Sequence, residues 1–277
     1  MRTILFLTNF SKASRRALFG FLKFSTENIS ESINLILLNT YSRPQTGQGL
    51  MLSITDIIEE NAIADLKQEK KLIEKEFGKE KINIQIEARQ GKPYLVIERL
   101  CEHINIDLLL MGISSSNVLK ELIMGNVPGQ IIANTTIPTL LIPENLDFVK
   151  PQKIAVAANL NSIGESFAFK RMVDVLSMFN ADLVFFHLKT ESDIEENYSE
   201  LLSKFVTTEF SHYSIDVNNI YQGITNYLNE NDSNLIAILD EKEDTVYKLY
   251  NQNVTKKLTS LAKYPFIVVH DNREATE

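Results

Sequence analysis

The sequence predicts an α/β protein built from two tandem, doubly wound parallel sheets. Short apolar runs, typical of strands buried on both faces of a sheet, alternate with segments of helical periodicity. This alternation predicts right-handed βαβ crossovers and a parallel sheet. The order of elements then repeats, which predicts two domains, residues 1–145 and 151–277. A chain of 277 residues gives each domain enough length to bury a core of its own.

The first domain opens with an almost wholly apolar run, Ile4–Thr8, which predicts a strand. Apolar residues then recur at helical spacing in Ser11–Phe24, and a serine is well suited to cap the first turn of that helix. Ile33–Leu38 is expected to be the second strand. Arg43–Ser53 contains one proline and two glycines and is expected to be a loop, and Asp56–Phe77 has the pattern of a long amphipathic helix.

The rest of the first domain continues the alternation. Ile82–Ala88 is expected to be a strand, and Pro93 is suited to open a helix that runs to about His103. Asp107–Gly112 is a further apolar run, a helix is expected to begin near Gly125, and Thr139–Ile142 is the last strand. A linker, residues 143–151, separates this domain from the second.

The second domain is a degraded copy of the first. Its matching segments, aligned without gaps to those of the first domain, are Lys153–Asn159, Asp182–His187, Asn234–Leu239, Gln252–Val254 and Pro265–Val269. Leu239 and Gln252 take the places of Gly112 and Gly125. The middle of this domain, residues 191–210, is acidic and helical in spacing. The loss of both glycines suggests that the second domain is kept for a structural role.

One segment of the first domain has the features of an anion site. The strand that ends at Gly112 is followed by the polar stretch Ser114–Ser116, and Gly125–Pro128 opens the next helix. Glycine lets a backbone approach an anion closely, and the first amides of a helix have no partner within the helix. The segment therefore predicts a phosphate cradle, although the same glycines also suit a strand exit and a helix start.

These residues resemble the universal stress protein family in its tandem two-domain form. The family's nucleotide loop, G-x-x-G, nine residues, then G-[S/T], corresponds here to Gly112–Ser115, residues 116–124 and Gly125–Asn126. Asn9-Phe10-Ser11 resembles the family's D-x-S after the first strand, and Asn39-Thr40 lies where the family has H-V beside the adenine. The resemblance implies a Rossmann-like, adenine nucleotide alpha hydrolase-like fold that binds ATP or another adenine nucleotide.

The positions implied to contact the nucleotide lie on four segments of the first domain. They are Thr8, Asn9, Thr40, Met111, Gly112, Ser115, Gly125, Asn126 and Val127. Two of them depart from the family pattern, since Ser115 replaces a glycine and Asn126 replaces a hydroxyl residue. In the second domain, Asp240–Asp244 presents four carboxylates where phosphates would lie, so we expect at most one nucleotide per chain.

Charge and composition exclude several other classes of function. Residues 1–150 hold 17 basic and 17 acidic residues, so the net charge of −8 lies in the second half, and no basic stripe for nucleic acid is present. No apolar run is long enough to span a membrane, and no secretion signal precedes the first strand. Cys101 is the only cysteine, and the four histidines lack metal-ligand spacing. We therefore expect a cytoplasmic protein without a structural metal.

The sequence thus predicts a universal-stress-type regulatory module that binds adenine nucleotide, weakly or conditionally, in its first domain. The resemblance also implies that the edge strand Thr139–Ile142 pairs with its equivalent, Phe266–Val269, within one chain. Two alternatives stay open at this point. One is a nucleotide-free scaffold whose domains pair with each other and with a second chain, as a homodimer. The other is a slow nucleotide hydrolase, for which no catalytic motif is present.

Overall fold

The computed structural model of the protein describes residues 1–42, 51–114, 127–161, 163, 166–189, 197–216, 226–231, 233–241 and 264–271. Its strands are β1 (Arg2–Leu7), β2 (Ile33–Tyr41), β3 (Ile82–Gln90), β4 (Leu108–Ile113), β5 (Thr139–Pro143), β6 (Lys153–Ala158), β7 (Asp182–Lys189), β8 (Phe210–Asp216), β9 (Ser233–Glu241) and β10 (Phe266–Asp271). Its helices are α1 (Lys12–Asn28), α2 (Met51–Phe77), α3 (Pro93–Cys101), α5 (Val127–Ala133), α6 (Phe167–Ser177) and α7 (Tyr198–Ser203).

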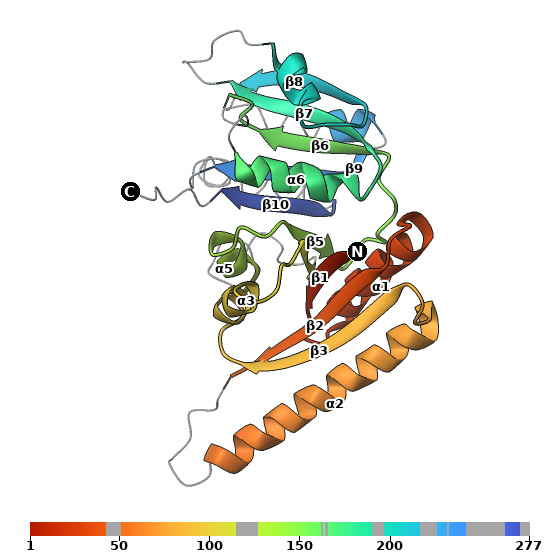
Figure 1. Ribbon diagram of the computed structural model, residues 1–277, viewed down its shortest axis with the longest axis vertical. Helices are drawn as coiled ribbons and strands as arrows, with labels where there is room; N and C mark the ends of the chain where they lie inside the picture. Colours follow the sequence, from red (N-terminus) through yellow and green to blue (C-terminus); the bar gives the residue numbers. More distant parts are fainter. Residues whose placement is uncertain are drawn as a thin grey trace.

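All ten strands form one sheet, in the order β3-β2-β1-β4-β5-β10-β9-β6-β7-β8 (Figure 1). The strands of each half pair in parallel, as the alternating pattern predicts. The two halves meet where β10 pairs antiparallel with β5, so that Phe266, Ile267 and Val268 lie opposite Leu141, Leu140 and Thr139. This pairing confirms the expected contact between the two edge strands. It also points the carboxyl ends of the two sets of strands in opposite directions.

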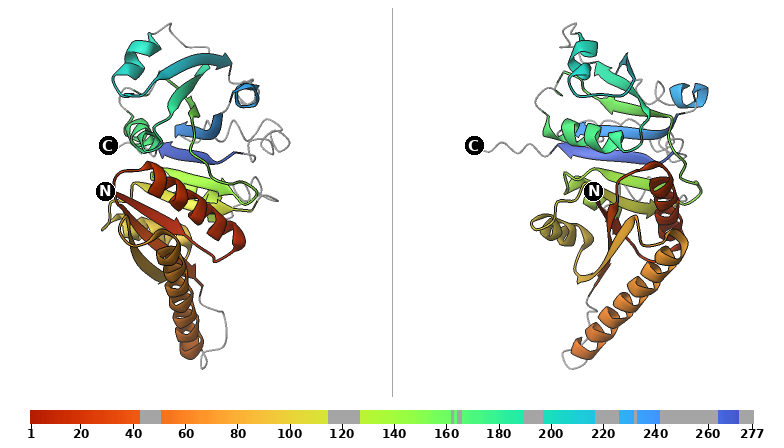
Figure 2. Two further views of the ribbon diagram at one scale, coloured as in Figure 1. Left: turned by 90° about the vertical axis from the view of Figure 1, so that its right-hand side faces the viewer. Right: turned by 45° about the vertical axis from the view of Figure 1, so that its right-hand side comes forward.

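Helices cover both faces of this sheet and enclose two cores that each extend across both halves. One core lies between the sheet and α1, α2, α6 and α7, and the other lies between the sheet and α3 and α5. In Figure 2, α2 is seen to run beyond the edge of the sheet. An α/β fold of two tandem, mostly parallel units is therefore confirmed.

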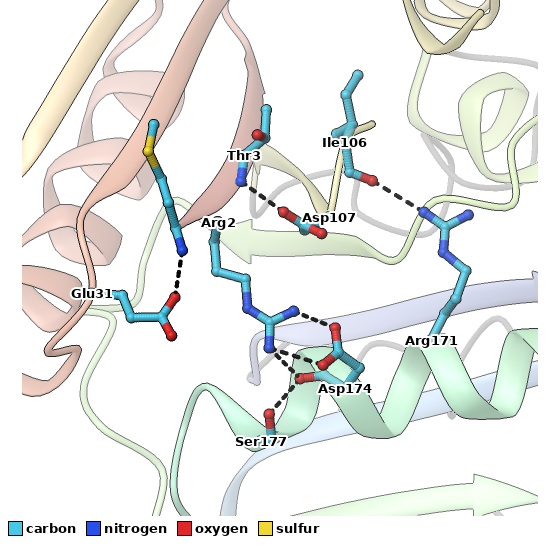
Figure 3. Close-up of polar contacts among 9 residues, drawn as sticks. Arg2, Thr3, Glu31, Ile106, Asp107, Arg171, Asp174 and Ser177 are labelled. Carbon is cyan, nitrogen blue, oxygen red and sulfur yellow. Dashed lines mark hydrogen bonds and ion pairs between the residues drawn. The ribbon is translucent and has the colours of Figure 1, made fainter. Parts of the chain in front are cut away.

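The halves also contact each other outside the strand pairing. On one face, Phe24 of α1 stacks on Phe179, which follows α6, at 5.3 Å between ring centroids, and Phe148 of the linker meets Phe24 edge-on at 5.6 Å. Arg2 of β1 forms a two-pronged ion pair with Asp174 of α6 (Figure 3). We refer to the β5–β10 pairing and these contacts together as the seam.

Local sequence signals explain where most elements begin and end. The predicted N-cap Ser11 is confirmed, because its Oγ accepts a hydrogen bond from the Ser14 amide at 3.2 Å. The end of the expected loop Arg43–Ser53 was wrong, because the chain is already helical at Met51. Residues 191–196 of the segment 191–210 lie outside the described residues, and the rest of it contains the helix α7 and the start of β8. Among the described residues, strand β8 pairs only with β7, and its polar side chains explain why a search for apolar runs does not predict it.

Candidate functional site

The candidate site lies at the carboxyl ends of β1, β2 and β4, next to the start of α1. After β1 the chain makes a tight turn, in which Thr8 Oγ1 accepts hydrogen bonds from the Phe10 amide at 3.0 Å and from Ser14 Oγ at 3.1 Å. Phe10 has a φ of +59°, a conformation that is uncommon for a residue other than glycine. Such strained backbone concentrates at functional positions. Thr8 is 4% exposed, so its side chain shapes the turn from within.

Asn9 occupies the outer side of the same turn. Its Oδ1 accepts a hydrogen bond from the Ser11 amide at 3.1 Å, which is the way asparagine commonly closes a turn ahead of a helix. The side chain is exposed, and the amide nitrogen is the remaining donor group. An aspartate would close the turn equally well but would bring a negative charge. The asparagine therefore supplies a neutral donor at the edge of the sheet.

A side chain from β2 ties the second strand end to the first. Asn39 Nδ2 donates to the carbonyl oxygen of Thr8 at 2.8 Å, and the Thr8 amide donates to the carbonyl of Leu38 at 2.9 Å. Thr40, the position implied to lie beside an adenine, follows and is half-buried. Burial raises the pKa of the next residue, Tyr41, and a hydrogen bond with Glu59 acts in the same direction. Asn39 was not singled out as a site residue, yet it holds this edge together.

Gly112 has a structural role that the sequence interpretation did not foresee. A Cβ added at this position would lie 2.4 Å from the Ala13 carbonyl oxygen and 2.8 Å from Ser14 Cα. The glycine therefore lets the first turn of α1 press against β4, and its free side is taken up by α1. The expected ligand approach at Gly112 stays a prediction, beside this structural reason for the missing side chain. Met111 is buried in the core on the α3 and α5 face, so only its backbone reaches the edge.

The remaining predicted positions divide into two groups. Ser115, Gly125 and Asn126 lie outside the described residues. Val127 begins α5 and is 40% exposed. The structure thus brings Thr8, Asn9 and Gly112 together around the start of α1, with Thr40 at the end of the adjoining strand.

The second half has the same turn but a different interior. Asn159 Oδ1 accepts from the Asn161 amide at 3.1 Å, as Asn9 does in the first half. His187, which is 1% exposed, accepts from the Leu160 amide through Nδ1 at 3.0 Å. Since Nδ1 is an acceptor, neutral His187 carries its proton on Nε2 and donates to the Tyr198 hydroxyl at 3.0 Å. That hydroxyl donates to Asn161 Oδ1 at 2.6 Å, so the chain of hydrogen bonds runs from the buried His187 to the exposed Asn161.

This chain of hydrogen bonds is expected to stabilise the second half. Tyr198→Phe removes the hydrogen bonds with His187 and Asn161, leaves the buried Nε2 of His187 without this partner, and should lower the free energy of unfolding by about 1–3 kcal/mol. Urea unfolding followed by circular dichroism measures the change. Tyr213→Phe is the matched control, because Tyr213 is 50% exposed, and it should leave the unfolding midpoint nearly unchanged. Equal midpoints for Tyr198→Phe and the parent protein would contradict this assignment.

Comparison with known proteins identifies the family. The model of the universal stress protein family matches residues 1–143. The chain belongs to this family. A search of curated proteins found no match. Within the described residues, no helix has both the length and the apolar character that spanning a membrane requires.

One solved structure of a universal stress protein shares the fold over nearly the whole chain, and others are similar to about half of it. One from Archaeoglobus fulgidus DSM 4304 is similar over 97% of this chain and 98% of its own, with 15% identity and a TM-score of 0.63. A protein of the family from Burkholderia pseudomallei is similar over 51% of this chain and 95% of its own, with 17% identity and a TM-score of 0.40. A universal stress protein in complex with cAMP is similar over 52% of this chain and 98% of its own, with 17% identity and a TM-score of 0.38. At these identities the likeness concerns the fold alone.

Proposed function

We propose that this universal stress protein binds one adenine nucleotide, ATP, at the carboxyl edge of β1, β2 and β4. Binding without turnover would let it act as a regulatory module in the stress response. Family membership supports the role in stress, and one observation carries the ligand: three strand ends are locked together where the strand order reverses. In β3-β2-β1-β4-β5 that point lies between β1 and β4, where doubly wound sheets bind their ligands.

The chemistry of this edge suits a nucleotide. The turn residues hold the backbone rigidly, so a ligand would meet donors that are already ordered. Asn9 offers a neutral amide donor and Thr40 lies at the end of the neighbouring strand. Ser115, Gly125 and Asn126, outside the described residues, would complete the site as the phosphate loop of the family pattern.

The second half supports a stoichiometry of one. Its equivalent edge holds the hydrogen bonds that join His187, Tyr198 and Asn161, and Leu239 is buried at the place of Gly112. The side chain of His187 is thus engaged inside the protein. The sequence Asp240–Asp244, of which residues 242–244 lie outside the described residues, carries four carboxylates that would repel a phosphate.

A nucleotide-free scaffold is the second candidate, and the seam favours it. The seam joins both halves into one sheet and leaves β3 and β8 as its outer strands. In this function the second half would serve to complete the sheet, and the first-half edge would be a relic.

A pair of matched variants tests the nucleotide proposal by calorimetry with ATP. Asn9→Ala and Asn159→Ala remove the same turn-closing side chain from the first and the second half. We expect one site per chain. Asn9→Ala should weaken ATP binding about tenfold, as for the loss of one hydrogen bond, and Asn159→Ala should leave it unchanged.

A double variant tests the two departures from the family pattern. Ser115→Gly with Asn126→Ser should strengthen ATP binding by roughly 1–3 kcal/mol. Two equivalent sites would contradict the stoichiometry, and no binding in the parent or the double variant would favour the scaffold.

A further inference from the structure

A groove at the seam has the composition of a second binding site. Its volume is about 320 Å³, at the lower end of the range for small-ligand pockets. It is lined by the end of α3, by the turns that precede β4 and β5, and by Arg171 of α6, so both halves contribute to it. The lining turns lie at the amino ends of the first-half strands, opposite the candidate nucleotide edge.

Arg171 supplies the groove with a positive charge that no carboxylate neutralises within the described part of the chain. Its Nη2 donates to the carbonyl oxygen of Ile106 at 3.0 Å and its Nη1 to Thr136 Oγ1 at 3.4 Å, and both acceptors are neutral. The ion pairs among the described residues do not include it, whereas Arg2 on the same seam faces Asp174 (Figure 3). A guanidinium has five donors and binds carboxylates through two of them at once. The chemistry of Arg171 therefore favours a ligand with a carboxylate.

Glu98 supplies a negative charge in the same groove. It makes no ion pair with Arg171, although both charges act on the thiol of Cys101, which lines the same groove. A phosphate ester would meet repulsion from this carboxylate, whereas an ammonium group would be attracted. The groove thus complements a ligand that carries both charges.

The rest of the lining combines apolar and polar side chains. Ile104 is half-buried and Ile137 is buried, and Asn105, Asn134, Thr135 and Thr136 supply polar groups beside them. Thr135 Oγ1 accepts from the Ile137 amide at 3.2 Å, which leaves its hydroxyl proton to donate. We propose that the groove binds a free amino acid with an aliphatic side chain, its carboxylate held by Arg171 and its ammonium group facing Glu98. Such a ligand would bridge the two halves.

The only cysteine of the chain reports directly on occupancy. Cys101 lines the groove and is exposed, so a disulfide reagent such as Ellman's reagent reaches its thiol. Burial raises the pKa of this thiol and the charge of Arg171 partly opposes that, so the reaction is run at mildly alkaline pH. With leucine as the probe, we expect the modification rate of the full-length protein to fall in a saturable manner. Acetate and methylamine, which each carry one of the two charges, should protect far less at equal concentration.

Three variants separate binding from the integrity of the seam. Arg171→Gln should weaken protection by leucine at least about tenfold, the factor that corresponds to 1.4 kcal/mol. Arg2→Gln breaks a seam ion pair outside the groove and should leave protection by leucine intact. Glu98→Gln should reduce the preference for leucine over acetate even if Arg171→Gln fails to fold. Absence of protection by leucine, equal protection by acetate in the parent, or full protection in Arg171→Gln would each overturn the proposal.

Discussion

Replacement of Gly112 by leucine is expected to abolish stable folding of the first half. Even the Cβ would lie 2.4 Å from a backbone oxygen of α1, and real Cβ atoms essentially never approach a neighbour closer than 3.0 Å. Neither β4 nor the first turn of α1 can yield easily, because both are fixed in the core. Overpacking typically costs about 1–3 kcal/mol, and a whole leucine against backbone should cost more than that range.

The second half shows what a leucine at this place requires. Leu239 is buried in the second half, where helix α6 begins only at Phe167, well after β6 ends at Ala158. In the first half, α1 begins at Lys12, directly after the Thr8–Ser11 turn, and leaves no such room. Urea unfolding measures the effect of Gly112→Leu. Gly20→Ala is the milder comparison, because its Cβ would meet Phe148 Cβ at 3.1 Å, which requires a shift of only a few tenths of an ångström, and alanine favours the helix. An unchanged midpoint for Gly112→Leu would show that α1 does not depend on this close approach.

Separate expression of the two halves is expected to yield no stable monomer of either. Leu140, Leu141 and Ile267 at the seam are fully buried in the intact chain, and each is worth roughly 1.5–3 kcal/mol of burial relative to full exposure. Separation would also expose two apolar sheet edges, β5 and β10, which invite aggregation. Co-expression should restore a soluble complex of the two.

Size-exclusion chromatography with light scattering distinguishes the outcomes. Residues 1–145 and 151–277 are compared alone, mixed after purification and co-expressed. Aggregation of each half alone, with a soluble pair on co-expression, is the expected result. Two well-behaved monomers that fail to associate would show that the seam contributes little to stability.

The features that the sequence predicted are those encoded by neighbouring residues. The apolar run that becomes β1, the capping serine at residue 11 and the repeated strand order all depend on local pattern. The roles that it missed depend on partners far along the chain. The need for glycine at residue 112 comes from its contact with Ala13. The role of His187 comes from its hydrogen bond with Tyr198, and the acidic sequence between these two residues gives no sign of that contact. Strand β8 was not predicted, because this edge strand carries polar side chains that do not form an apolar run.

The covalent link between the halves changes the kind of equilibrium that holds the sheet together. Two separate subunits that meet edge to edge come apart on dilution, and their stability rises with their concentration. Here residues 144–152 connect β5 to β6 and hold β10 beside β5 at a high effective concentration that dilution does not alter. Each copy also has a permanent partner that differs from itself. Unlike the identical subunits of a symmetric pair, the two copies are free to diverge, so one can specialise for a ligand while the other completes the sheet.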